Sequence, residues 1–292
     1  MHEFLRAVGL KSIKTKEQLK ALTAWVLEKP DRFRAASLPD EENLAVAERL
    51  TSESSGVAVV GAVNEQGDLV PEYYFPYTGS SLISSDAPLS VEKQISRNGY
   101  IGLCEDDRLD ISLIFSVKNV TDAAKQLQEG MLTGKLFRRV SLSLLLSDGT
   151  ILLPIAIPDR VLKKREESEK RRKALMNDYA NGDPEAFEKM ARESVLRFEK
   201  MMDRVEKSDV YSVVNSFFMP HGMESDRYYF LGTIKHCREN ENRITHEHFY
   251  EMTVDVNGME FSASVNASDL TGVPAEGYRL RGHAWMSGEL RY

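Results

Sequence analysis

The sequence predicts an α+β protein with three parts: an N-terminal mixed or antiparallel sheet with helices, a helical-hairpin connector, and a C-terminal small β-barrel of the OB-like or SH3-like kind. Three observations predict this class. Helices and strands are grouped along the first half of the chain and do not strictly alternate. Residues 163–173 contain no apolar side chain. Short strand-like segments separated by turn signals fill the C-terminal part.

These observations divide the 292 residues into an α+β domain over 1–157, a helical connector over 158–208 and a barrel domain over 209–292. Hydrophobic residues make up 42% of the chain, which is enough to bury a core without metals or disulfides. The division therefore predicts two self-sufficient domains held apart by a helical spacer.

The first domain opens with two predicted helices. Residues 15–30 carry apolar side chains at 3- and 4-residue spacing, and Thr15 with Gln18 forms a capping-box pattern. Residues 38–50 are predicted to form a second helix, because Asp40 is a suitable N-cap and acids follow it in the first turn.

Strands follow these helices. A third, short helix is expected over 119–130, capped by Thr121 and ended by Gly130. Asp148-Gly149 predicts a tight turn that joins two strands into a hairpin over 138–158. The other expected strands of this domain cover residues 56–63, 69–77, 99–104 and 109–117.

The connector is predicted to be a pair of helices, 159–182 and 183–207. Asp183 is placed as the N-cap of the second helix, with Pro184 at its first position. A helical segment without an apolar face is not held by burial, so residues 163–173 are expected to be solvated.

The last part reads as a barrel of four strands with a possible fifth over 211–219. Asn257-Gly258 is the strongest short hairpin signal in the chain. The four main strands are expected over 226–239, 243–256, 259–265 and 277–292.

Two stretches resemble a known family. They are "MHEFLRAVGLKSIKTKEQL" at residues 1–19 and "DVYSVVNSFFMPHGMESDRYYFLGTI" at residues 209–234. Both resemble an uncharacterised protein family of Gram-positive anaerobic bacteria with chains of about this length. The resemblance implies no activity, ligand or catalytic residue.

A cluster of histidines is the candidate metal site. If a hairpin turn is centred near Glu241, His236 lies opposite His246, and His246 and His248 share one face. Three imidazoles placed in this way are a zinc-binding set. The alternative is that they are ordinary surface residues, because a slip of one residue rearranges every cross-strand pair.

His221 is the second candidate. It lies between Pro220 and Gly222, and a histidine in such a turn could face a ligand of the barrel. The alternative is an ordinary turn residue. No histidine lies between His2 and His221, so a histidine base for the first domain would have to come from the last one.

The function that these features favour is a cytoplasmic, non-enzymatic binding or assembly protein with an unknown protein or small-molecule partner. Cys104 and Cys237 form no disulfide framework, and no stretch has the length of a membrane span. A net charge of -7 disfavours nucleic acid as a partner. No cofactor is expected, apart from zinc at the histidine cluster. The alternatives are a metal-dependent hydrolase that uses His236, His246 and His248, and single-stranded nucleic-acid binding by the barrel.

Overall fold

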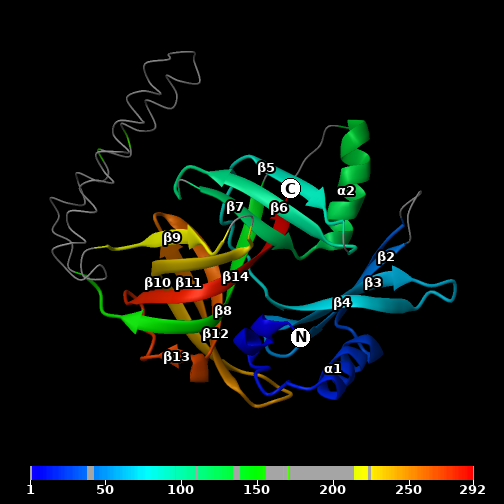
Figure 1. The fold of residues 1–292 in the computed structure, drawn as a ribbon, viewed down its shortest axis with the longest axis horizontal. Helices are drawn as coiled ribbons and strands as arrows, with labels where there is room; N and C mark the ends of the chain where they lie inside the picture. The colour runs from blue at the N-terminus through cyan, green and yellow to red at the C-terminus, as the bar shows by residue number, and fades with distance from the viewer. Residues whose placement is uncertain are drawn as a thin grey trace, which may run out of the picture. The chain divides into compact units, whose positions relative to one another are not determined.

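The computed structural model describes residues 2–37, 43–95, 97–109, 111–133, 139–155, 214–222 and 225–291, together with Glu167 and Lys170. Contacts divide the chain into two compact units, one of Met1–Leu153 with Ser216–Tyr292 and the other of Pro154–Asn215. All helices and strands named below belong to the first unit (Figure 1). The predicted helical connector over 158–208 lies outside the described residues, apart from Glu167 and Lys170.

The first unit has few helices and many strands. Its helical elements are the 3-10 helices η1 (Glu3–Val8) and η2 (Ala267–Asp269) and the α-helices α1 (Lys16–Glu28) and α2 (Val120–Thr133). Its strands are β1 (Arg32–Ala36), β2 (Leu44–Leu50), β3 (Ser55–Val63), β4 (Leu69–Thr78), β5 (Leu89–Lys93), β6 (Tyr100–Asp106), β7 (Ile111–Val117), β8 (Arg139–Leu152), β9 (Phe217–Pro220), β10 (Arg227–Glu241), β11 (His248–Val256), β12 (Met259–Asn266), β13 (Leu270–Thr271) and β14 (Arg279–Arg291).

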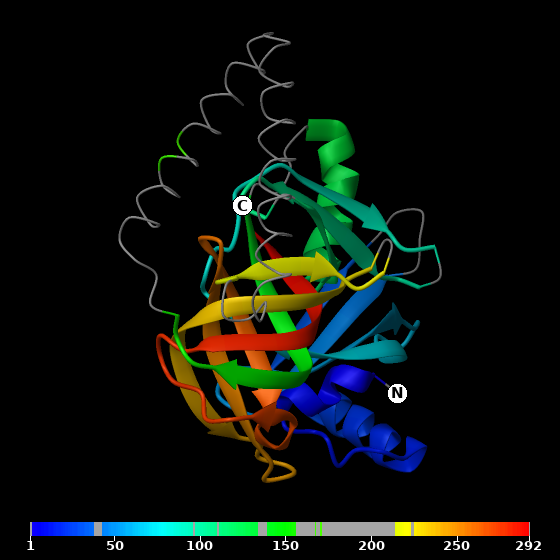
Figure 2. The same ribbon diagram turned by 60° about the vertical axis from the view of Figure 1, so that its left-hand side comes forward.

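The N-terminal part of this unit is a four-stranded antiparallel sheet in the order β1-β2-β3-β4. Helices α1 and α2 lie on opposite sides of it (Figures 1 and 2). The predicted capping box of α1 is confirmed, since the Thr15 side chain accepts from the Gln18 amide and the Gln18 side chain accepts from the Thr15 amide. Leu22 and Val26, on the apolar face of α1, are buried.

A closed five-stranded barrel forms the other part. Its strands follow one another in the order β8-β12-β11-β10-β14, and β14 pairs with β8 to close the ring. The prediction of a small barrel is confirmed. Its fifth strand is β8 from the N-terminal half of the chain, while β9, which contains the end of the predicted strand 211–219, pairs with β10 outside the ring. The Asn257-Gly258 turn joins β11 to β12, and both of its residues have positive φ, 55° and 84°.

Two predicted elements are wrong. Within the predicted helix 38–50, Leu44–Leu50 is strand β2, and residues 38–42 lie outside the described part. Leu44 through Ala47 are all buried, so the strand shows no alternation by which a helix could have been ruled out. The predicted hairpin over 138–158 is instead one continuous strand, β8. Its Asp148-Gly149 pair follows a bulge at Ser147, the residue skipped in the pairing with β14.

Helix α2 also differs from its prediction at both ends. It begins at Val120 and ends at Thr133. Thr121 therefore lies inside its first turn and not at the cap, and Gly130 lies inside the helix.

Strand β14 binds three neighbours at once. It pairs with β10 over Arg279–Trp285, with β8 along its whole length, and with β7 at Ser287 and Gly288. Strands β6 and β5 continue the sheet beyond β7. A single hydrophobic core therefore includes residues from both halves of the chain, such as Val59, Phe115, Leu144 and Phe261. The ranges 1–157 and 209–292, predicted as two domains, thus contribute to one compact unit because β8 and β14 form one ladder.

A partly buried carboxylate joins the four-stranded sheet to the barrel. Glu251 on β11 accepts hydrogen bonds from the hydroxyls of Ser54 (2.6 Å), Ser55 and Thr78 (3.2 Å). Arg238 and Asn240 on β10 donate to it at 2.9 and 2.7 Å. Burial acts to raise the pKa of Glu251, but the hydrogen bonds outweigh burial and lower the pKa below its usual value.

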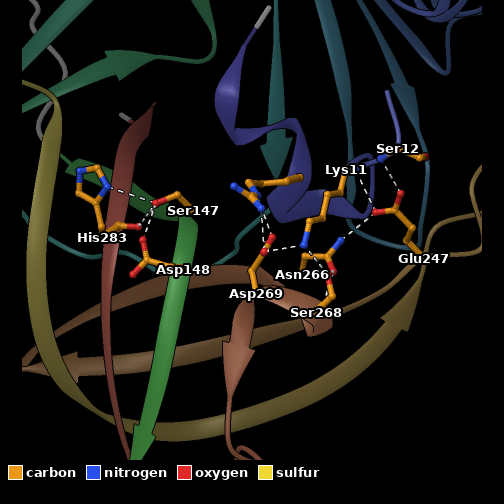
Figure 3. A network of polar contacts seen from close by, with 10 residues as sticks. Lys11, Ser12, Ser147, Asp148, Glu247, Asn266, Ser268, Asp269 and His283 are labelled. Carbon is orange, nitrogen blue, oxygen red and sulfur yellow. Dashed lines mark hydrogen bonds and ion pairs between the residues drawn. The ribbon is translucent and has the colours of Figure 1, made fainter. Parts of the chain in front are cut away.

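The N-terminal segment packs against both parts of the unit, since η1 contacts the barrel strands β8 and β12 and strand β4 of the four-stranded sheet. Residues Phe4, Leu5, Ala7 and Val8 of η1 are buried. Figure 3 shows the polar contacts that hold the following residues: Glu247 accepts from the backbone amides of Lys11 (2.9 Å) and Ser12 (2.7 Å), and Lys11 donates to Asp269.

We predict that Glu251→Gln lowers the free energy of unfolding by about 2–4 kcal/mol near pH 7, because the donors around it lose their charged acceptor. Since the folded-state pKa of Glu251 is lowered, its contribution is present above the pKa of the unfolded chain and is lost as pH falls through the folded-state pKa. Urea denaturation of both proteins between pH 7 and pH 3 measures this.

The matched control is Glu260→Gln on the neighbouring strand β12, which is expected to change stability by less than about 0.5 kcal/mol. Equal losses in the two variants, or a loss that does not shrink in acid, would show that Glu251 is not the junction.

Candidate functional site

A pocket lies where the four-stranded sheet, the β6–β7 hairpin and the barrel strand β14 meet. We call it the Lys118 pocket. Its lining comes from the start of the chain, from β4, from the segment between β5 and β6, from β6 and β7, and from β14. The residues that line it are His2, Tyr73, Phe75, Gln94, Arg97, Gly99, Tyr100, Ser116, Val117, Lys118, Trp285 and Ser287.

Lys118 is a buried amine that makes no ion pair with the described residues. It follows β7 directly, and its backbone amide donates to the Gly288 carbonyl of β14 at 2.8 Å. The side chain is 7% exposed, and its Nζ donates to the Thr78 carbonyl and to the Ser143 hydroxyl, each at 3.0 Å. Burial, which disfavours the charged form, lowers the pKa of Lys118 to about 8.

Two further polar atoms at the pocket have no hydrogen-bond partner among the described residues, Ser287 Oγ and His2 Nδ1. Ser287 is fully buried on β14. The centre of the His2 ring lies 4.6 Å from that of the Trp285 ring. The backbone amide of His2 donates to the Tyr74 hydroxyl at 2.7 Å. Burial, with added repulsion from Arg97 and other positive groups, lowers the pKa of His2 to about 4. The imidazole is therefore neutral at pH 7.

The walls of the pocket are aromatic and its charges are positive. Tyr73, Phe75, Tyr100 and Trp285 form the walls, and the Arg97 guanidinium lies 4.8 Å from the centre of the Tyr73 ring. None of the twelve lining residues is an aspartate or a glutamate. A concave site with cations and no acid favours an anionic group.

The pocket is small. The space inside it, including the open mouth, is about 320 Å³, but the cavity that admits water is about 20 Å³. This cavity takes about one water molecule, or a group of a few atoms that displaces one.

The predicted three-histidine site does not have the predicted register. His236 lies opposite Thr253, and His248 lies opposite Glu241, while His246 is in the turn with φ 59°. The predicted pairing of His236 with His246 is therefore wrong.

The three rings also have separate partners. His236 contacts Glu276 at 3.2 Å, His246 contacts Glu241 at 2.5 Å, and His248 contacts Glu239 at 2.9 Å. In the part of the chain that the structure describes, no group of three or more His, Cys, Asp or Glu side chains is placed to hold a metal ion.

His221 lies against other rings on the outside of the barrel. Its ring centre is 4.9 Å from that of Tyr229 and 4.8 Å from that of His283. Next to them, the Ser147 hydroxyl lies 2.8 Å from Asp148 Oδ2 and 3.2 Å from His283 Nδ1 (Figure 3). The carboxylate contacts the serine and not the histidine, so this is not the order of a catalytic triad.

Sequence reasoning missed the Lys118 pocket. Lys118 is a single lysine after a strand, and nothing in its local sequence distinguishes it from a surface lysine. His2, Lys118 and Ser287 come together only through the pairing of β14 with β7.

The fold and pocket define a mixed-sheet protein with a closed five-stranded barrel and a cationic pocket beside it. A family model described as "Domain of unknown function, E. rectale Gene description (DUF3881)" matches residues 5–288. The chain belongs to this family, which confirms the resemblance to an uncharacterised family of a Gram-positive anaerobe. No curated protein and no solved structure matches the chain.

Among the described helices, none has the length and apolar content needed to cross a membrane.

We predict that the free energy of unfolding rises by about 3 kcal/mol between pH 8 and pH 10.5 through Lys118 alone. In this range the unfolded chain still binds a proton that the folded protein has released, so the folded state gains with rising pH. Urea denaturation at several pH values measures the rise.

In Lys118→Met this rise is absent, whereas the surface variant Lys125→Met of helix α2 retains it. Parallel pH curves for wild type and Lys118→Met would contradict the burial of an unpaired amine.

Proposed function

We propose that this protein is a non-enzymatic binding protein whose Lys118 pocket holds the anionic group of a small molecule. The observation that carries the proposal is a buried lysine in a pocket that no acid lines. The charges of Glu289 and Glu48 act to raise the pKa of Lys118, but burial outweighs them, and neither makes an ion pair with it among the described residues. A buried cation is costly unless it is paired, and a bound carboxylate supplies the missing partner.

The other polar groups of the pocket support the same ligand class. Ser287 Oγ is a buried hydroxyl with a free donor, and Arg97 adds a second cation at the mouth. The aromatic walls favour an apolar body next to the anionic group. The cavity of about 20 Å³ limits the bound head group to a few atoms.

Contacts on the outer face of the barrel disfavour nucleic acid as the partner. We infer that the barrel is OB-like, and its strand order supports this inference: β10, β11 and β12 form an antiparallel meander, and β12 is parallel to β8. Such barrels bind oligonucleotides on their second and third strands. Here Glu251 of β11 is covered by Ser54, and Ser264 of β12 donates to the Ala7 carbonyl at 2.6 Å, so parts of this face are occupied by the chain's own N-terminal residues.

A cytoplasmic location is part of the proposal. Cys104 and Cys237 are both free, which suits a reducing compartment. The metal-dependent hydrolase has no such support, since His236, His246 and His248 each contact a different glutamate.

The test is a calorimetric and thermal-shift titration with formate, acetate and pyruvate, with acetamide as the neutral control. We expect saturable binding of at least one carboxylate and a melting temperature that rises with its concentration. Lys118→Met is expected to bind at least about tenfold more weakly, a loss of about 1.4 kcal/mol, while Lys125→Met binds as wild type does.

Arg97→Gln is the second variant, because Arg97 is exposed and its replacement leaves the core intact. It is also expected to weaken binding. Absence of binding by every carboxylate, or unchanged binding in both Lys118→Met and Arg97→Gln, would refute the proposal.

A further inference from the structure

We propose that His246 and His248 bind one divalent transition metal ion, such as Zn²⁺ or Ni²⁺, through the Nε2 atoms of their rings, with water at the remaining coordination positions. The site lies in an open groove at the start of strand β11, which we call the histidine groove. It shares no residue with the Lys118 pocket, so the inference stands apart from the proposed function.

The histidine groove has room for a hydrated ion. Its lining comes from the segments 11–14, 246–248 and 266–268, and the volume in it that admits water is about 410 Å³. One water molecule occupies about 30 Å³ of the liquid. The side chains of His246 and His248 both line the groove and are 76% and 57% exposed. An ion that keeps several of its waters can therefore reach both rings without a change in the core.

Contacts with strand β10 hold the two rings on one face. Glu239 and Glu241 are two residues apart on β10, so their side chains point to the same side of the strand. His246 Nδ1 lies 2.5 Å from Glu241 Oε1, and His248 Nδ1 lies 2.9 Å from Glu239 Oε1. The two imidazoles are thus anchored side by side at the same groove.

The glutamates also decide which ring nitrogen can bind a metal. A carboxylate accepts hydrogen bonds and does not donate them, so Nδ1 of each ring carries the proton. In the neutral ring the lone pair is then on Nε2, which becomes the ligand atom. Histidines that bind metals almost always donate their other ring N–H to such an acceptor, which fixes the tautomer and makes the ligand more basic. Imidazole nitrogens suit zinc, copper and nickel.

The charges around the groove favour a cation. The two glutamates that contact the rings and Glu247 of the lining carry three negative charges. Glu247 accepts from two backbone amides and from Asn266 at 2.8 Å, so it adds charge and not a ligand atom (Figure 3). Of the two lysines in the lining, Lys11 is held by Asp269 at 2.7 Å, and Lys14 leaves one positive charge.

His236 provides a matched control. Its side chain is 78% exposed and its Nδ1 contacts Glu276 at 3.2 Å, so it resembles the other two histidines in exposure and partner. It does not line the histidine groove. A single imidazole supplies one ligand where the pair supplies two, so the pair replaces the predicted three-histidine site.

The test is a calorimetric titration of the full chain, without an affinity tag, with Zn²⁺ and Ni²⁺. Mg²⁺, which prefers oxygen ligands, is the control for charge alone. We expect His246→Ala and His248→Ala each to bind Zn²⁺ at least about tenfold more weakly than wild type, while His236→Ala binds as wild type does. Because the three side chains are exposed, all three variants are expected to keep the wild-type melting temperature.

Two further measurements test the geometry. The double variant Glu239→Ala with Glu241→Ala is expected to weaken Zn²⁺ binding by about tenfold, because both rings lose the acceptor of Nδ1–H. In long-range ¹H–¹⁵N spectra, Zn²⁺ is expected to shift the Nε2 signals of His246 and His248 and not those of His236. Absence of Zn²⁺ binding, a loss in only one of the two histidine variants, or an equal loss in His236→Ala would refute the site.

Discussion

The pairing of β14 with three strands is the constraint on which the rest of the structure depends. The ladder of β14 with β8 closes the barrel, and the contact with β7 attaches the β5-β6-β7 sheet to it. Close packing at this crossing requires glycine, since a Cβ at Gly288 would lie 2.4 Å from the Phe115 ring and one at Gly102 would lie 2.1 Å from it. The two halves of the chain therefore fold around one shared strand.

The Lys118 pocket follows from this crossing. Because the Lys118 amide binds the Gly288 carbonyl, the residue after β7 is fixed beneath β14, and its side chain is enclosed by β4 and β8. The N-terminal segment brings His2 against Trp285 from the other side. A buried amine, a buried hydroxyl and a neutral imidazole thus share one small aromatic pocket without a carboxylate. The proposal that the pocket binds a carboxylate rests on this composition.

Local signals in the sequence predicted what depends on local interactions. The capping box of Thr15 and Gln18, the Asn257-Gly258 turn and most strands are set by near neighbours, and these predictions are confirmed. The pairing of β8 with β14 joins residues more than a hundred positions apart, so it leaves no local pattern, and the local sequence at Asp148-Gly149 predicts a turn. The same long-range pairing explains why two domains were predicted from one unit. The predicted histidine register is wrong because the connection between β10 and β11 spans residues 242–247 and is not centred near Glu241.

The account depends on Lys118 being a buried amine that makes no direct ion pair with the described residues, with Glu289 and Glu48 too weak to offset its burial. The most direct test is a titration of its side chain by NMR, with ¹³C-labelled lysine and the Lys118 signal assigned by its loss in Lys118→Met. The account predicts a midpoint near pH 8 for Lys118 and a shift of that midpoint on addition of a bound carboxylate. A midpoint near 10.5, the value for a lysine in water, would contradict it.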